Sequence, residues 1–148
     1  MGYYNMYEYE TDSIEKLAQY YILNHKVKIE YDKQITVEGR KYVTTVLNGV
    51  FTSGMIVKTQ GVDAWIESDK EQKPVKQKWV EYCLLRHVNG DCGLCCTEDQ
   101  LANEEGIKEG YRTMSVYEWD MCESEKVKIW IITEYGHEYT TVLFPDEY

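Results

Sequence analysis

A short run of cysteines in the middle of the chain constrains the fold more than any other feature of the sequence. Four of the five cysteines and one of the three histidines lie between residues 83 and 96. Cys92 and Cys95 form a C-x-x-C motif, and the small Gly93 inside it allows backbone amides to turn toward two thiolates. Cys83 and His87 are four residues apart, so a helix would place both side chains on one face.

Together, these two pairs match the ligand set of a structural zinc site. A closed zinc site takes four sulfur or nitrogen ligands in a tetrahedral arrangement. The expected ligands are Cys83, His87, Cys92 and Cys95, with Cys96 or Cys122 as a substitute. Two alternatives stay open: reduced thiols that hold no metal, and a redox-active C-x-x-C pair.

The sequence lacks the motifs of the common enzyme classes. Zinc deaminases carry a glutamate two residues after their histidine, whereas Asn89 stands at that position after His87. The zinc-protease motif H-E-x-x-H, the nucleophile motif G-x-S-x-G and the phosphate-binding glycine loops are also missing. We therefore expect a protein that is not an enzyme, and a zinc-dependent enzyme is kept as an alternative.

The 148 residues have the length of one domain, with a weak sub-boundary at the polar and charged residues 68–74. The sequence contains no run of 18 apolar residues, so we expect no membrane span. The first residues lack the basic segment and apolar core of a signal peptide. We expect a cytoplasmic protein in a reducing compartment, where clustered cysteines bind metal more often than they form disulfides.

The negative charge is concentrated after the cysteine segment. The net charge is −10; residues 1–90 hold twelve acids and twelve bases, and residues 91–148 hold fourteen acids and four bases. The electric field of this excess negative charge repels nucleic acid and attracts basic surfaces. We therefore expect a protein partner with a basic surface, and neither direct nucleic-acid binding nor membrane binding. The expected contact residues are Glu98, Asp99, Glu104, Glu105 and Glu109.

The hydrophobic spacing predicts an α+β fold, mainly an antiparallel sheet with two or three short helices. Helices are expected over residues 13–24, 74–88 and 97–105, the last ended by Gly106. Residues 79–87 fit a strand nearly as well, because Val80, Tyr82 and Leu84 also recur at every second position. Strands are expected over residues 27–31, 34–38, 42–47, 50–59, 62–67, 112–121, 126–135 and 138–144. The tyrosine-rich residues 3–9 are expected to form a further strand or an arm.

Two segments of the chain resemble each other. Residues 27–47 begin with Val-Lys-Ile, contain a glycine and end with Thr-Thr-Val-Leu, and residues 127–143 follow the same order. This order predicts two similar hairpins, each reversing at its glycine. A duplication explains the similarity, and so does the shared preference of Val, Thr, Ile and Tyr for strands.

These features favour a non-enzymatic, acidic binding protein that inhibits a protein partner, and imitation of a nucleic acid is one way in which it would act. Small acidic proteins without catalytic motifs include virus-encoded antagonists of host defence, and this analogy concerns composition alone. The alternative is a protein that binds or sequesters a small molecule such as a nucleotide through tyrosine and tryptophan rings. Its candidate stacking residues are Trp65, Trp79, Trp119 and Trp130, beside fourteen tyrosines.

Overall fold

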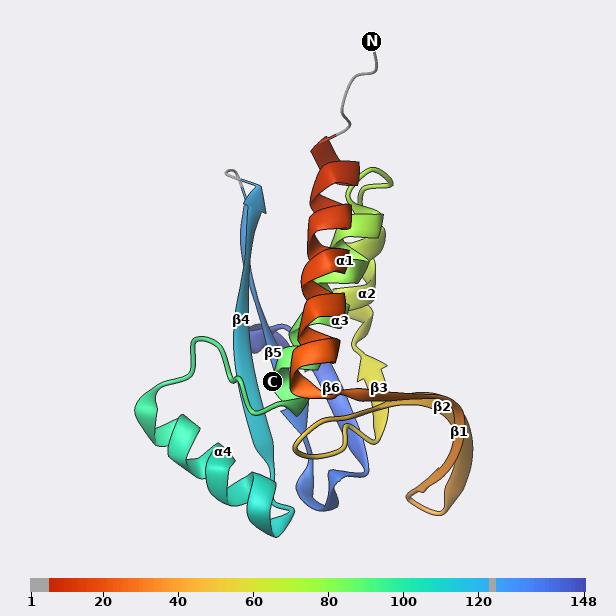
Figure 1. Cartoon of the computed structure of the whole chain (residues 1–148), viewed down its shortest axis with the longest axis vertical. Helices are drawn as coiled ribbons and strands as arrows, with labels where there is room; N and C mark the ends of the chain where they lie inside the picture. The colour runs from red at the N-terminus through yellow and green to blue at the C-terminus, as the bar shows by residue number, and fades with distance from the viewer. Residues whose placement is uncertain (1–5, 123–124) are drawn as a thin grey trace.

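A computed structural model describes residues 6–122 and 125–148 (Figure 1). The fold is α+β, as predicted, and the described residues form four α-helices and two sheets. The helices are α1 (Met6–His25), α2 (Gln60–Glu67), α3 (Lys73–Val88) and α4 (Thr97–Glu109). The strands are β1 (Lys28–Val37), β2 (Arg40–Asn48), β3 (Met55–Lys58), β4 (Thr113–Cys122), β5 (Glu125–Thr133) and β6 (Tyr139–Leu143).

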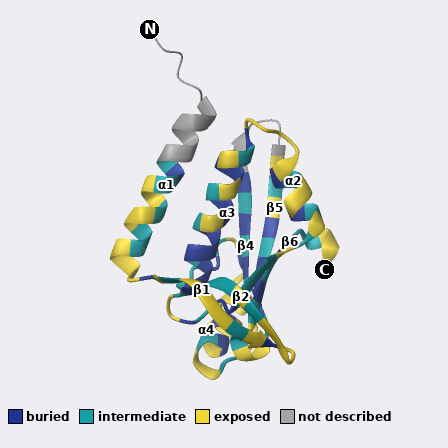
Figure 2. Cartoon of the chain, turned by 90° about the vertical axis from the view of Figure 1, so that its right-hand side faces the viewer, coloured by how far each residue is buried: buried dark blue, intermediate teal, exposed yellow. Residues whose placement is uncertain are grey.

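The larger sheet has the strand order β3-β6-β5-β4. Strands β4, β5 and β6 pair antiparallel, and β3 pairs parallel to β6. Strands β1 and β2 form a separate antiparallel ribbon. Figure 2 shows α3 between α1 and the four-stranded sheet, so the molecule has three layers beside the ribbon. Within the described residues, none of the helices has the length and apolar character needed to cross a membrane.

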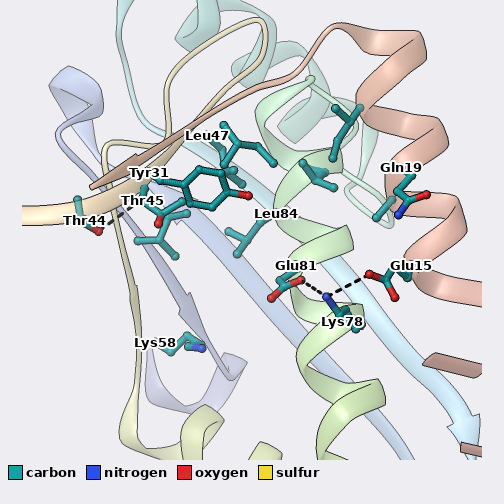
Figure 3. A pocket seen from close by; sticks show the side chains of 15 residues that line it. Glu15, Gln19, Tyr31, Thr44, Thr45, Leu47, Lys58, Lys78, Glu81 and Leu84 are labelled. Carbon is teal, nitrogen blue, oxygen red and sulfur yellow. Dashed lines mark hydrogen bonds and ion pairs between the residues drawn. The ribbon is translucent and has the colours of Figure 1, made fainter. Parts of the chain in front are cut away.

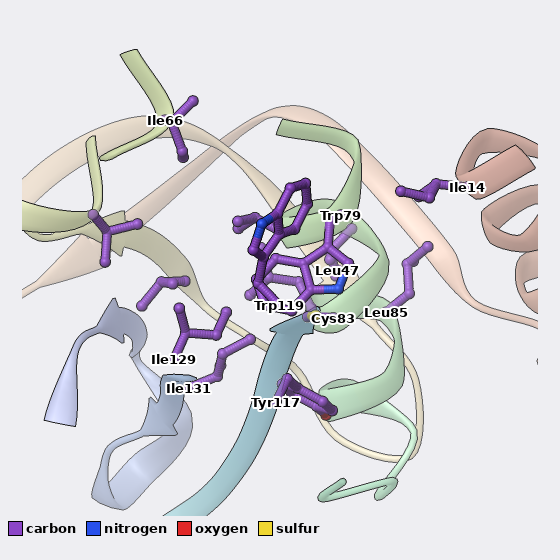
Figure 4. Packing of buried hydrophobic residues seen from close by; sticks show 14 of the residues in the cluster. Ile14, Leu47, Ile66, Trp79, Cys83, Leu85, Tyr117, Trp119, Ile129 and Ile131 are labelled. Carbon is purple, nitrogen blue, oxygen red and sulfur yellow. The ribbon is translucent and has the colours of Figure 1, made fainter. Parts of the chain in front are cut away.

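Three tryptophan rings lie at the centre of the core. Trp119 on β4 packs edge-to-face on Trp65 and on Trp79, with 5.4 Å between ring centroids in both pairs. Figure 4 shows Trp79, Trp119 and Cys83 next to one another, with Ile129 and Ile131 of β5 close by. The inner face of the sheet and one face of α3 therefore bury their apolar side chains together, which is the main source of stability.

The strand predicted over residues 62–67 is wrong, because these residues form α2. The helix begins after Thr59, whose hydroxyl accepts a hydrogen bond from the Val62 amide at 3.2 Å and so caps the first turn. Val62 and Ile66 are four residues apart and form the buried face of the helix. A short apolar run fits a strand or a helix equally well when it is read from sequence.

Two predicted helix boundaries are also wrong, and the predicted number of helices is too small. Helix α1 begins at Met6 instead of residue 13, so the described part of the expected N-terminal strand is helical. Helix α4 continues through Gly106 to Glu109 and ends at Gly110, which has a φ of +74°. Gly106 is required for packing, since a Cβ there would lie 2.8 Å from the carbonyl oxygen of Arg112.

The prediction of two similar hairpins is confirmed. Strands β1 and β2 pair across a turn that contains Gly39, and β5 and β6 pair across a turn that contains Gly136. The two glycines have φ values of +79° and +84°, which L residues rarely adopt. The glycine in each segment therefore stands where the chain reverses.

Candidate functional site

The four cysteines between residues 83 and 96 lie in different surroundings. Cys83 is fully buried in the hydrophobic core, whereas Cys96 is exposed at the start of α4. Cys92 and Cys95 lie together beside β4, where the Cys95 thiol donates to the Met114 carbonyl at 3.3 Å. Burial, and next the hydrogen bond with Cys92, raise the pKa of Cys95 to about 12. The Cys95 thiol is therefore held in its protonated form.

An ion pair fixes the turn before the C-x-x-C motif. Arg86 contacts Asp91 with both Nε and a terminal nitrogen, at 2.8 and 3.2 Å. Burial by itself would raise the pKa of Asp91, but the hydrogen bond and charge of Arg86 hold this pKa below its ordinary value. The same carboxylate accepts from the Gly93 amide at 3.1 Å. Segment 92–94 is thereby held along the edge of β4, where the Leu94 amide donates to the Val116 carbonyl.

His87 uses both ring nitrogens inside the protein. Its Nδ1 lies 2.6 Å from the Ser115 hydroxyl and its Nε2 lies 2.8 Å from the Thr133 hydroxyl. The side chain is 1% exposed, and burial, followed by the charge of His137, lowers its pKa to about 3. His87 is therefore neutral at physiological pH and connects α3 to β4 and β5.

The hydrogen-bond partners of the network determine which nitrogen carries the proton. Thr140 donates its single hydroxyl proton to the Ser53 carbonyl at 2.6 Å, so it must accept from Thr133 at 2.7 Å. Thr133 has then used its own proton, so Nε2 of His87 donates to Thr133. The unprotonated Nδ1 accepts from Ser115. This chain of four hydrogen bonds leaves no free position for a substrate, because all of its side chains are buried.

Among the residues that the structure describes, no group of three or more His, Cys, Asp or Glu side chains could hold a metal ion. A zinc ion on the four expected ligands would require one of the two hydrogen bonds of His87 to break and the buried Cys83 thiol to lie beside Cys92 and Cys95. Cys122 ends β4, and its side chain lies outside the described part of the chain. The zinc site stays a prediction.

Helix α4 carries all five expected contact residues, and each of them is exposed. None of these five carboxylates forms an ion pair with another described residue. The helix is attached to β4 by Asn103, whose amide group donates to the Met114 carbonyl at 2.6 Å and accepts from the Met114 amide at 2.9 Å. Figure 1 shows α4 beside the first residues of β4, away from α1 and α2.

Apolar side chains accompany the carboxylates of α4. Leu101 is 60% exposed, and Val50 and Leu94, which lies three residues before the helix begins, are similarly exposed. Val50, Leu101 and Ile107 line a shallow depression of about 620 Å³ together with Glu104 and Glu105. This region, called the α4 surface below, is defined by α4, Leu94 and Val50, and it combines apolar contact area with unpaired negative charge.

The four tryptophans, which were expected to stack a nucleotide base, do not lie exposed on the surface. Trp79 and Trp119 are buried, and Trp65 is half-buried against them. Trp130 is half-buried and packs on Tyr148 at 5.5 Å between ring centroids. The stacking alternative therefore depends on exposed tyrosines, and it stays a prediction.

Sequence reasoning missed the hydroxyl partners of His87. Ser115, Thr133 and Thr140 lie on strands, where Ser and Thr are ordinary residues, and the only signal was their position on the inner face of the sheet. The chain matches no protein-family model, no curated protein and no solved structure. The function is therefore inferred from the geometry of the chain itself.

Proposed function

We propose that the protein is a non-enzymatic binding protein whose α4 surface binds a basic region of a protein partner. The observation that carries this proposal is the set of five exposed carboxylates on one helix, none of which is paired with another described residue. Unpaired charges of one sign attract a partner of opposite charge and accelerate its association. The exposed Leu94, Leu101 and Val50 supply the apolar area that a specific interface needs.

The attachment of α4 supports this role, because it presents the charges in a fixed arrangement. Asn103 binds the backbone of β4 from both sides of its amide group, and Gly110 ends the helix in a left-handed turn. Glu98, Glu105 and Glu109 lie along a helix of thirteen residues, which is about 20 Å long. Such a row of negative charge is the feature by which a helix would imitate a nucleic-acid strand toward a basic enzyme.

The test compares two variants with the same change in net charge. In the first, the five α4 carboxylates are replaced by their amides: Glu98→Gln, Asp99→Asn, Glu104→Gln, Glu105→Gln and Glu109→Gln. In the matched control, five exposed acids elsewhere are replaced: Glu38→Gln, Asp63→Asn, Glu71→Gln, Glu138→Gln and Asp146→Asn. Binding to a panel of basic nucleic-acid-binding enzymes is measured by calorimetry between low and high salt.

We expect the α4 variant to bind about tenfold more weakly than the wild type and to lose most of the salt dependence, whereas the control stays close to the wild type. Competition with DNA for the same enzyme tests the mimicry. If both variants lose affinity equally, the effect comes from net charge and the α4 surface is not the interface. Binding that does not change with salt would also contradict the proposal.

A further inference from the structure

A groove of about 630 Å³ lies between α1, α3 and the β1–β2 ribbon (Figure 3). Strand β3 contributes to one side of it. The volume falls within the range of small-molecule sites. Its floor is apolar and consists of Ile22, Ile29, Leu47, Ile56, Leu84 and Leu85. The groove is therefore large enough, and apolar enough, to cover the hydrocarbon part of a small ligand.

The charges along the groove are distributed unequally. Lys78 lies between Glu15 and Glu81, at 3.8 and 3.6 Å, so its charge is already neutralised (Figure 3). Lys58 forms no hydrogen bond or ion pair with any described residue, and Figure 3 shows it apart from these three side chains. The groove thus has an unpaired positive charge at Lys58, whereas Glu15, Lys78 and Glu81 together carry a net charge of −1.

Lys58 is an exposed lysine at the border of the groove. It lies on the edge strand β3 and, two residues after Ile56, points to the same face of the strand, which lines the groove. A charged lysine on an edge strand also disfavours pairing of that strand with another chain. That role needs no ligand, so the binding measurements described below distinguish the two explanations.

A bulge in β1 brings an aromatic ring to the groove. The pairing of β1 with β2 shifts between Glu30 and Lys33, and Asp32 has a φ of +51°. Bulges of this kind change the direction of neighbouring side chains. Tyr31, inside the bulge, lines the groove although it is 72% exposed, and Figure 3 shows its ring beside Leu47. A ligand in the groove would cover this ring and bury apolar surface that water now contacts.

We propose that this groove binds a small amphiphile with an apolar body and a single anionic group, a carboxylate or a phosphate, placed at Lys58. The net negative charge of the Glu15, Lys78 and Glu81 group disfavours the opposite orientation. The proposal goes beyond the protein-binding function and does not depend on it, because none of the five α4 carboxylates lines the groove.

Isothermal titration calorimetry with four probes of equal chain length tests the proposal: decanoate, decyl phosphate, decanol and decyltrimethylammonium. We expect decanoate or decyl phosphate to bind most tightly and the cation to bind most weakly, and the two anions identify the preferred head group. Lys58→Met weakens anion binding about fivefold and leaves decanol unchanged. Lys41→Met, which removes an exposed lysine outside the groove, is the matched control and leaves all four affinities unchanged.

Two further variants test the location of the site. Tyr31→Ala weakens the charged and the neutral probes alike, because it removes apolar contact area. Gln19→Trp, on the exposed edge of the groove, abolishes binding of all probes while the circular dichroism spectrum stays that of the wild type. Equal affinity for the cation and the anions would overturn the proposal, as would anion binding that Lys58→Met leaves unchanged.

Sedimentation equilibrium of the wild type and of Gln19→Trp completes the test. We expect both chains to sediment alike. A wild-type dimer that Gln19→Trp converts to a monomer would identify a second copy of the chain as the occupant, and it would overturn the proposal.

Discussion

The hairpins β1–β2 and β5–β6 have similar sequences and opposite surroundings. Both begin with Val-Lys-Ile and end with Thr-Thr-Val-Leu, and both reverse at a glycine with positive φ. Ile129 in the second hairpin is completely buried, whereas Ile29 at the equivalent position of the first is half-buried. Most of β1 is exposed or half-buried, and Val43 on β2 is exposed.

The difference follows from the neighbours of each hairpin. Strand β5 lies between β4 and β6, and α3 covers its inner face. Strands β1 and β2 have no third strand, and a two-stranded ribbon is marginally stable by itself. Val27 and Leu47 anchor the ribbon to the core. The comparison teaches that a local sequence selects the hairpin, while the surrounding elements decide how much the hairpin contributes to stability and what it leaves exposed for binding.

The largest expected effect is on the free energy of unfolding, when the two equivalent isoleucines are truncated. Ile129→Ala should lower the free energy of unfolding by about 4 kcal/mol, because it opens a cavity in a fully buried site. Ile29→Ala should lower it by about 1 kcal/mol, because the side chain is only half-buried. Urea denaturation followed by tryptophan fluorescence measures both values. If the two substitutions lowered the free energy of unfolding equally, the β1–β2 ribbon would contribute as much to stability as the central strands do.

The second effect concerns the buried histidine that holds β5. The pKa of His87 is lowered from 6.5 to about 3 in the folded protein. Between these values the unfolded chain binds more protons, so the stabilisation is complete above pH 6.5 and is lost as the pH falls toward 3. This group alone should remove about 2 kcal/mol between pH 7 and pH 5. Denaturation of wild type and His87→Gln at both pH values measures the difference in slope.

A direct measurement supports that test. The ring proton shifts of His87 in a nuclear magnetic resonance titration should stay those of neutral imidazole down to about pH 4. Titration of this ring near pH 6.5 would contradict the buried network.

The smallest expected effect comes from replacing the glycine at which each hairpin reverses. Gly39→Ala and Gly136→Ala should each cost about 1 kcal/mol, because both positions require a positive φ. An added Cβ meets nothing closer than 4.0 Å at either position, so steric overlap adds nothing to the backbone cost. The two losses should agree within error in thermal or urea denaturation. A much larger cost at Gly136 would show that the turns, too, depend on their surroundings.

Several elements could be predicted from sequence because their signals are local. The helix over α3, the last three strands and the acidic helix α4 follow from spacing and turn residues within a few positions. The strand predicted over α2 was wrong, because Val62 and Ile66 fit both periods and the cap at Thr59 was overlooked. Of the four expected zinc ligands, Cys92 and Cys95 are brought together, while Cys83 is buried in the hydrophobic cluster and His87 is bound by Ser115 and Thr133.

The sequence by itself determined that the chain reverses at Gly39 and Gly136, that α3 and the last three strands form, and that the acidic excess follows the cysteines. These properties depend on neighbours three or four residues away. Only the tertiary structure decided that His87 is bound by Ser115 and Thr133, and that Lys58 lies beside a groove formed with α1 and α3. These contacts join residues that are tens of positions apart, so they exist only after the sheet and the helices have packed.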